Sequence, residues 1–155
     1  MHTLRLIEYG SRDYREMVRL RDMILRKPLG LHFTDTYLQQ EINDILIGCF
    51  DGTPGEETPA IIGCCILSPI DEEIVQLRQM AVQAAWQGTG AGKRIVSFAE
   101  EQARQSGFKI MMMHARKTAM PFYEKLGYKI IGEEFLEVSI PHFEMQKKLT
   151  LNLSK

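Results

Sequence analysis

Apolar residues recur along the chain at two different spacings, and the order of these spacings predicts a mixed α/β sheet. Alternating or continuous apolar runs predict strands over residues 3–9, 42–50, 60–67, 74–82, 109–113, 128–132 and 142–149. Spacings of three and four residues predict helices over 11–26 and 91–105, with shorter helices within 29–40 and around Tyr123. A segment with Gly and Pro over 51–55 separates two apolar runs and predicts a hairpin.

A glycine-rich turn joins the predicted strand 74–82 to the predicted helix 91–105. It contains Gln87, Gly88, Thr89, Gly90, Ala91, Gly92 and Lys93. The N–H groups of a first helical turn have no partner within the helix, and the helix dipole places about half a positive charge there. Glycines also let a ligand approach the backbone closely. The turn is therefore predicted to bind an anion such as a phosphate.

Two common phosphate-binding motifs do not match this turn. A P-loop needs two glycines separated by four residues and followed by Lys and Ser or Thr, whereas Gly88 and Gly92 are separated by three and Arg94 follows Lys93. The dinucleotide motif G-x-G-x-x-G needs glycine at the position of Lys93 and an acidic residue about 20 positions later, where the chain has methionines. Both of these nucleotide sites are excluded.

The turn instead resembles the pyrophosphate loop of the GNAT superfamily of N-acetyltransferases, with Gln87, Gly90 and Gly92 filling the pattern Q-x-x-G-x-G. A second GNAT-like motif, Phe-Tyr-x-x-x-Gly-aromatic, follows over 122–128. The pattern Glu-x-Phe-x-Glu-x-x-Ile-Pro-His over 133–142 is similar to small bacterial acyltransferases related to ElaA and YjcF. This resemblance implies a GNAT-like α/β fold: a mixed, mostly antiparallel central sheet of about six to seven strands flanked by helices. It also implies acetyl-CoA as co-substrate.

The resemblance carries roles over to particular residues. In the family, acetyl transfer proceeds by direct attack of an amine on the thioester. The residues expected to contact the cofactor are the glycine-rich turn, Phe122, and the backbone of Met80, Ala81 and Val82, where the family's strand bulges. Preorganised N–H groups aimed at the thioester oxygen contribute a few kcal/mol to the rate in such sites. Tyr123 is expected to donate a proton to the departing thiolate, since a phenol is protonated at neutral pH.

The residue that removes the amine proton has several candidates. Glu137 and His142 could face the acceptor, one attracting a cationic amine and the other relaying its proton. Glu73, Glu133 and Glu134 are further candidates, and a solvated charge at position 137 with a chain turn at 141–142 is the alternative interpretation. The chain departs from the family at Arg116, where many members have asparagine. The charge of Arg116, or of its neighbour Lys117, suggests a contact with a coenzyme A phosphate.

Composition narrows the class of partner. The 155 residues fit one domain over 1–155, and 19 basic against 20 acidic residues make nucleic acid an unexpected partner. The sequence has no apolar run of about 18 residues and no signal-peptide pattern, so a cytoplasmic location without membrane contact is expected. Cys49, Cys64 and Cys65 lie in apolar runs and are predicted to be buried, reduced thiols. Since histidines and cysteines lack ligand spacing, no metal is predicted.

Two functions from different classes remain open at this point. The first is an acetyl-CoA-dependent N-acetyltransferase that acts on a primary amine of a small molecule or peptide. The second is a non-catalytic acyl-CoA-binding or interaction module with the same fold. In either case the resemblance places the acceptor or partner pocket between residues 25–40 and 133–143. Members of the family often form dimers, so a homodimer is expected.

Overall fold

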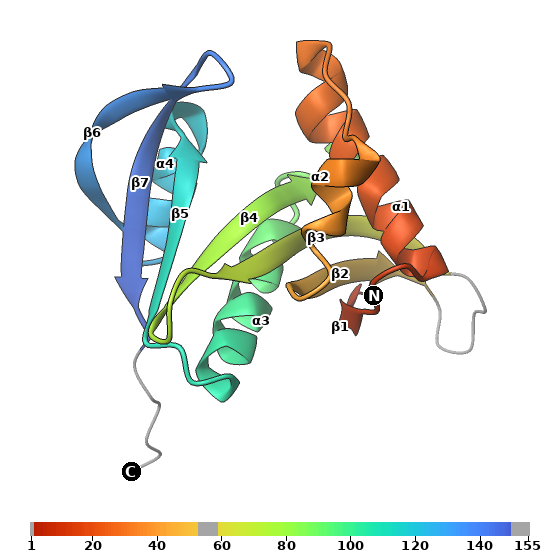
Figure 1. The fold of residues 1–155 in the computed structure, drawn as a ribbon, viewed down its shortest axis with the longest axis horizontal. Coiled ribbons are helices and arrows are strands. Elements are labelled where there is room, and N and C mark those ends of the chain that lie inside the picture. Colours follow the sequence, from red (N-terminus) through yellow and green to blue (C-terminus); the bar gives the residue numbers. More distant parts are fainter. Residues whose placement is uncertain (1, 53–58, 150–155) are drawn as a thin grey trace.

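The computed structural model describes residues 2–52 and 59–149 and places one mixed sheet at the centre of the chain (Figure 1). The strands are β1 (His2–Ile7), β2 (Ile45–Asp51), β3 (Ala60–Pro69), β4 (Ile74–Val82), β5 (Ile110–Arg116), β6 (Lys129–Glu137) and β7 (Ile140–Lys148). The α-helices are α1 (Arg12–Arg21), α2 (Asp35–Gln39), α3 (Ala91–Gln105) and α4 (Met120–Lys125). Short helical turns are η1 (Asp22–Arg26), η2 (Lys27–Leu29), η3 (Ala84–Trp86) and η4 (Lys117–Ala119).

The seven strands form one sheet in the order β1-β2-β3-β4-β5-β7-β6. Neighbouring strands pair antiparallel except β4 and β5, which pair parallel because α3 crosses over between them. The predicted fold class, a mostly antiparallel sheet with flanking helices, is confirmed. Of the predicted hairpin turn, residues 53–55 lie outside the described residues, but β2 and β3 do pair antiparallel as expected.

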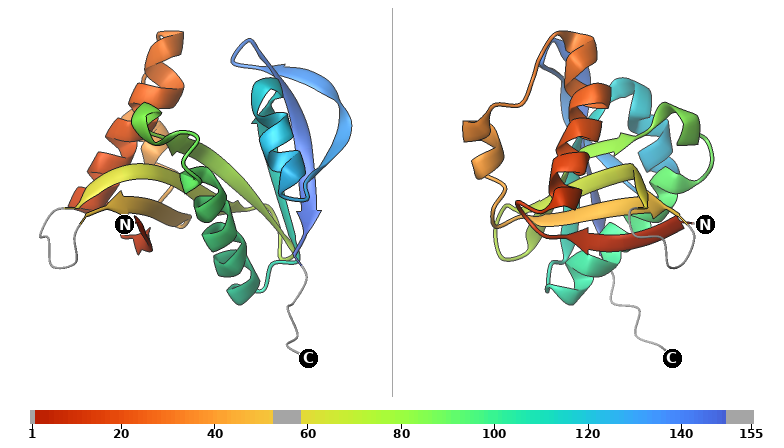
Figure 2. Two further views of the ribbon diagram at one scale, coloured as in Figure 1. Left: turned by 180° about the vertical axis from the view of Figure 1, so that it is seen from behind. Right: turned by 90° about the vertical axis from the view of Figure 1, so that its right-hand side faces the viewer.

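Helices cover the two faces of the sheet unequally. α1 packs on β3 and β4 from one face, and α3 packs on β2, β3 and β4 from the other (Figure 2). The middle of β3 is therefore buried on both sides, with Ile66 in the cluster under α1 and Leu67 in the cluster under α3. Because both faces of such a strand are buried, its sequence is a continuous apolar run rather than an alternation of apolar and polar residues. The predicted burial of the three cysteine thiols on and beside β3 is confirmed.

The sheet divides between β4 and β5. Their parallel pairing ends at Gln76 and Met112, although β4 continues to Val82 and β5 to Arg116. A register shift opposite Cys64–Ile66 and a positive φ of 55° at Gln79 mark a bulge in β4 at the same level. The two strands diverge beyond this point, giving the V-shaped profile in Figures 1 and 2. The expected bulge before the glycine-rich turn is present.

Two predicted segments differ from the structure. The helix expected over 11–26 begins at Arg12, after the N-cap Ser11, whose side-chain oxygen accepts from Tyr14 N–H, but it ends at Arg21. A π-helical turn follows, closed by the Lys27 N–H bonding to the Asp22 carbonyl oxygen, five residues back. The segment 133–141, in which no strand was expected, extends β6 to Glu137 and begins β7 at Ile140. This correction places Glu137 on a strand that pairs with the one carrying His142, which was already expected to lie on a strand.

Within residues 2–52 and 59–149, no helix combines the length and apolar composition that crossing a membrane requires.

Candidate functional site

A cavity of about 1050 Å³ occupies the opening between β4 and β5. We call it the central cavity. Its walls come from η1, α2, β4, the glycine-rich turn, β5, α4 and the β6–β7 hairpin. The predicted site residues that line it are Met80, Ala81, Val82, Gln87, Gly88, Gly90, Gly92, Lys93, Phe122, Tyr123, Glu137 and His142. Residues predicted separately for the cofactor and for catalysis therefore meet in one space.

Two predicted cofactor residues do not line the central cavity. The Thr89 hydroxyl donates to the Trp86 carbonyl oxygen, which fixes the turn locally. Ala91 is buried at the start of α3. Their side chains thus stabilise the conformation of the turn, and only their backbone N–H groups could contact a ligand.

The glycine-rich turn leaves the first turn of α3 open. Gly88 and Gly90 have positive φ values of 78° and 90°, which favour glycine, and no side chain caps the helix at Gly90. The Gln87 amide donates to the Val82 carbonyl oxygen at 3.0 Å and so ties the turn to the end of β4. The unpaired N–H groups of α3 therefore face the end of the β4–β5 opening, where an anion would be stabilised.

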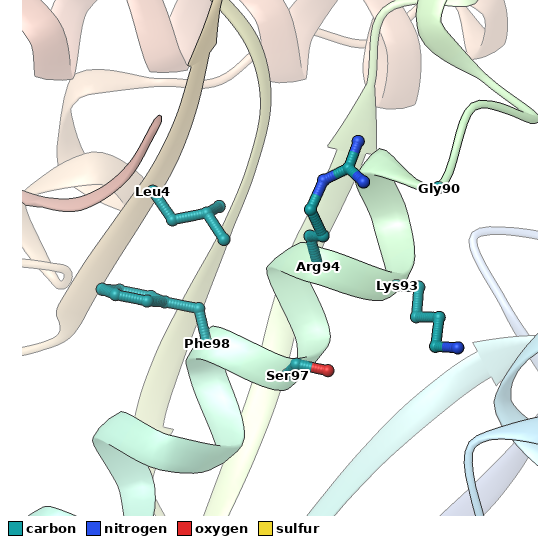
Figure 3. Close-up of a pocket in the computed structure, with 6 residues that line it drawn as sticks. All are labelled: Leu4, Gly90, Lys93, Arg94, Ser97 and Phe98. Carbon is teal, nitrogen blue, oxygen red and sulfur yellow. The ribbon is translucent and has the colours of Figure 1, made fainter. Parts of the chain in front are cut away.

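Close packing holds this end of the cavity together. A methyl group added to Gly92 would lie 3.2 Å from Phe122 Cζ and 3.5 Å from Met80 Cε. These contacts show that β4, α3 and α4 converge at Gly92. A second groove, of about 520 Å³, runs along α3 on the side of Leu4 and Phe98 (Figure 3).

Two cations accompany the open helix terminus. Lys93 and Gly90 line both the central cavity and the groove along α3, and Arg94 lines the groove (Figure 3). Positive side chains beside free N–H groups add to the attraction for a negatively charged ligand.

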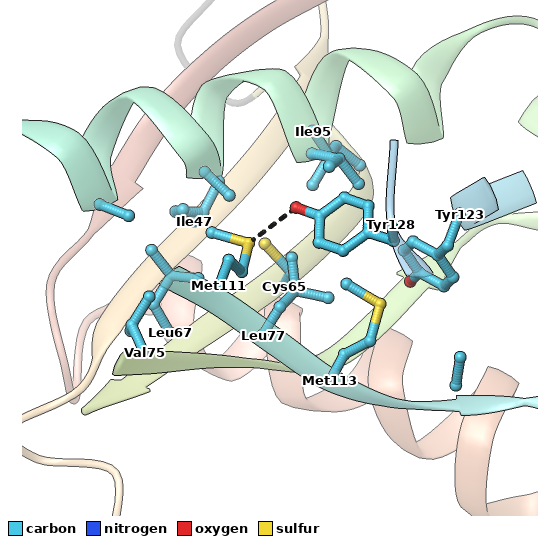
Figure 4. Packing of buried hydrophobic residues seen from close by; sticks show 14 of the residues in the cluster. Ile47, Cys65, Leu67, Val75, Leu77, Ile95, Met111, Met113, Tyr123 and Tyr128 are labelled. Carbon is cyan, nitrogen blue, oxygen red and sulfur yellow. Dashed lines mark hydrogen bonds between the residues drawn. The ribbon is translucent and has the colours of Figure 1, made fainter. Parts of the chain in front are cut away.

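Tyr123 lies in the floor of the cavity, at the edge of the hydrophobic core. It is 6% exposed, and its ring makes edge-on contacts with Phe122 and with Tyr128. Figure 4 shows Tyr123 beside Tyr128. Burial, with a smaller contribution from Cys65, raises the pKa of its hydroxyl above the ordinary value. Within the described residues the hydroxyl has no hydrogen-bond partner, so a protonated O–H is free to donate to a ligand.

A His-Glu-His cluster occupies the opposite wall. His114 Nδ1 lies 2.9 Å from Glu137 Oε1, and His142 Nε2 lies 3.8 Å from Glu137 Oε2. The Phe135 ring contacts both imidazoles, edge-on for His114 and stacked for His142. His142 is 4% exposed, and its Nδ1 lies 2.7 Å from the Ile140 carbonyl oxygen. Because a carbonyl only accepts, Nδ1 carries the proton, and Nε2 of a neutral ring is left with a lone pair.

The other candidate bases lie elsewhere. Glu73 precedes β4 at the end away from the cavity opening and is paired with Lys109 at 3.2 Å. Glu134 is paired with Lys117 at 2.9 Å, and Glu133 does not line the cavity. The geometry therefore favours Glu137 and His142 among the candidates.

Sequence reasoning singled out none of several polar lining residues, among them Arg26, Tyr37, Arg78, Gln79 and His114. The Tyr37 hydroxyl accepts from the side chains of Arg78 and Gln79. Since Tyr37 is about 40 positions from its partners in the chain, no local pattern could have linked them. The contact of His114 with Glu137 depends on the β6–β7 hairpin, which was not expected.

No group of three or more His, Cys, Asp or Glu residues able to hold a metal ion is found in the part of the chain that the structure describes.

A family model described as an acetyltransferase (GNAT) domain matches residues 56–149. The chain belongs to the GNAT acetyltransferase family. It is thus an acyltransferase, and the resemblance predicted from the sequence motifs is confirmed.

Individual relatives agree with the family. The uncharacterized protein YyaT of Bacillus subtilis is 30% identical over 117 residues, which cover 76% of this chain and 73% of YyaT. The uncharacterized N-acetyltransferase YjcF of B. subtilis is 34% identical over 73 residues, covering 46% of this chain and 52% of YjcF. The chain therefore aligns with about half the length of YjcF, and more of YyaT.

Solved structures share the fold over almost the whole chain. A putative N-acetyltransferase from Lactobacillus plantarum has a TM-score of 0.82 at 21% identity, covering 96% of this chain and 99% of its own. Escherichia coli ElaA has a TM-score of 0.76 at 17% identity, with coverages of 95% and 99%. A GNAT family acetyltransferase from Elizabethkingia anophelis, solved with acetyl-CoA bound, has a TM-score of 0.69 at 18% identity, with coverages of 95% and 97%.

Proposed function

We propose that this acyltransferase moves an acetyl group from acetyl-CoA directly to a primary amine of a small molecule or peptide. The observation that carries the proposal is the single cavity that joins an open helix terminus at Gly90 to a protonated Tyr123 and the Glu137–His142 pair. Family membership and the acetyl-CoA bound in the E. anophelis relative support the choice of cofactor.

The chain's own groups fit acetyl-CoA. The free N–H groups at 88–92 and the Lys93 ammonium suit a pyrophosphate. The β4 backbone from Leu77 to Val82, which β5 no longer pairs, offers N–H and C=O groups along the path that a pantetheine arm would take. Bound there, acetyl-CoA supplies a thioester whose carbonyl carbon is open to attack by an amine.

The acceptor amine reaches the cavity from the side of the β6–β7 hairpin. At neutral pH a primary amine carries a proton, so it must lose this proton before it can attack. The Glu137 carboxylate attracts the ammonium, and the lone pair on His142 Nε2 accepts the proton. His114 donates from Nδ1 to Glu137 and so orients the carboxylate.

The departing sulfur needs a proton in return. Tyr123 provides it, because burial keeps its hydroxyl protonated and no described residue competes for its O–H. The nitrogen loses a second proton as the amide forms, which offsets the proton that Tyr123 gives to sulfur, so the proton taken by His142 is the one released to solvent in each turnover.

Release of the coenzyme A thiol in the presence of a panel of primary amines tests the proposal. Tyr123→Phe should lower kcat by about 10²-fold, the usual contribution of a general acid, with little change in coenzyme A affinity. Tyr9→Phe is the matched control, because Tyr9 packs under α1 and does not line the cavity. Tight coenzyme A binding without thiol release from any amine would instead identify a non-catalytic acyl-CoA-binding module.

A further inference from the structure

The charges around the central cavity are unbalanced. Among the described residues, its lining holds four basic side chains, Arg26, Arg78, Lys93 and Arg116, and one carboxylate, Glu137. Lys93 lies beside the glycine-rich turn, where the cofactor phosphates are expected. The three arginines come from η1, β4 and β5, in the part of the cavity that remains for the acceptor.

Tyr37 holds two of these arginines in place. The Arg26 guanidinium lies 4.6 Å from the centre of the Phe33 ring and 5.3 Å from that of Tyr37. Arg78 lies 5.8 Å from the centre of the Tyr37 ring and donates to the Tyr37 hydroxyl and to Ser68 Oγ. Aromatic faces fix a guanidinium by cation–π contact while leaving its N–H edge free to bind an anion.

Among the described residues, these arginines have no acidic partner. Neither Arg26 nor Arg116 forms an ion pair there. Burial raises the pKa of Asp44 and the charge of Arg78 partly opposes that rise, without the two residues forming an ion pair. Elsewhere a buried arginine is matched, as Arg21 is by Glu41 at 2.6 Å. Partly buried like charges without a counter-ion are costly, so an anion entering the cavity would be stabilised there.

Arg116 faces the same space from β5. Its Nη2 donates to the Leu25 carbonyl oxygen at 3.5 Å, which brings the guanidinium across the cavity to η1, the element that carries Arg26. This contact favours a position on the acceptor side over the earlier expectation of a coenzyme A phosphate.

We propose that the acceptor is an amine that also carries an anionic oxyacid group, a carboxylate or a phosphate, held by Arg26, Arg78 and Arg116. The assignment rests on the proposed function for the amine end, which Glu137 on β6 attracts. Arginine's planar fork of donors matches both oxyacids. A polycationic amine, by contrast, would meet three repelling charges and one attracting charge.

Matched ligand pairs test this proposal without requiring turnover. Calorimetry on the full chain would compare ω-amino acids from glycine to 6-aminohexanoate with the corresponding alkylamines, and phenylalanine with phenethylamine. Aminoethylphosphonate distinguishes a phosphate-type group from a carboxylate, and spermidine represents a polycation. Thiol release from acetyl-CoA would be measured with the same compounds.

At least one anion-bearing amine should bind about tenfold or more tightly than its neutral partner, since a charge-assisted hydrogen bond contributes about that much. Arg26→Gln and Arg116→Gln should each reduce this preference, with coenzyme A affinity unchanged. Arg19→Gln, on the exposed side of α1, is the control and should leave the preference intact.

Equal binding of both members of every pair, or a preference that survives Arg26→Gln and Arg116→Gln together, would overturn the proposal. A loss of coenzyme A affinity in Arg116→Gln would also overturn it, because that guanidinium would then belong to the cofactor. An anion preference in binding without thiol release would refute acetyl transfer and leave the anion site standing. Thiol release without an anion preference would refute the anion site and leave acetyl transfer standing.

Discussion

Glu41→Gln should destabilise the protein strongly, because it leaves a buried charge without its partner. Arg21 is completely buried and binds Glu41 through two hydrogen bonds of 2.8 and 2.6 Å, while the Tyr14 hydroxyl donates to the same carboxylate at 2.8 Å. Burial alone lowers the pKa of Arg21, but the hydrogen bond and charge of Glu41 raise it above the ordinary value, so the guanidinium stays charged. Glutamine keeps the shape of Glu41 and removes the charge.

Breaking a buried ion pair from one side costs about 3–5 kcal/mol, against a total stability of about 5–15 kcal/mol for a domain. At about 2–4 °C per kcal/mol for a chain of this size, the melting temperature should fall by about 6–20 °C. The assay is urea unfolding followed by circular dichroism, with calorimetric melting as the second readout. Glu16→Gln is the matched control: its partner Arg19 is exposed and 3.1 Å away, so about 0.5 kcal/mol or less is expected.

A double variant sharpens this test. Arg21→Met combined with Glu41→Leu should cost clearly less than the sum of Arg21→Met and Glu41→Leu alone, because removing both charges leaves none unpaired. A loss below about 1 kcal/mol in Glu41→Gln, or additive costs in the double variant, would refute the reasoning. The pair matters for the site because Arg21 immediately precedes η1, whose residues form the acceptor side of the cavity.

Three further predictions concern the core and the cavity wall. Burial raises the pKa of Cys64 from an ordinary value of 9.0 to about 12, so the native state holds the proton more tightly and stability should fall as pH rises through 9. The free energy of unfolding from urea titrations should be about 1 kcal/mol lower at pH 10 than at pH 8, and Cys64→Ala should remove this part of the slope. Tyr128→Phe removes a buried donor to Glu100 at 2.7 Å and should cost about 1–3 kcal/mol in urea unfolding, whereas Tyr9→Phe should be nearly neutral. His114→Gln should lower kcat less than Glu137→Gln does, since His114 only orients the carboxylate; equal losses in steady-state assays would contradict that role.

The sequence predicted the elements that bury one clear face. The observed bounds of β4 and α3 coincide with those expected, because the apolar period is regular and glycines mark the boundary between them. The glycine-rich turn could be recognised for the same reason: its special backbone conformations demand glycine at Gly88 and Gly90. For β4, α3 and the turn between them, the local sequence was therefore sufficient for the prediction.

The β6–β7 hairpin could not be predicted in the same way. Only the start of β6, within the predicted strand 128–132, was expected. β6 is an edge strand whose residues are almost all exposed, so no apolar alternation marks its continuation over 133–137. Its turn uses Val138 and Ser139 at positive φ, and a β-branched residue is among the least expected there. The cluster of Tyr37 with Arg26 and Arg78 was missed because it forms only when α2 folds beside β4.

Coenzyme A binding measured by calorimetry tests the central claim most directly. Gly90→Asp places a carboxylate at the open terminus of α3, and Gly107→Asp places one at the other end of the helix. The two glycines have nearly the same φ, 90° and 91°, and at neither position does a backbone atom lie within 4 Å of the added Cβ. The two variants should therefore carry similar backbone strain. The account predicts that the wild type and Gly107→Asp bind coenzyme A with similar affinity and that Gly90→Asp loses most of it. Equal affinity in all three proteins, or no binding by the wild type, would contradict the account.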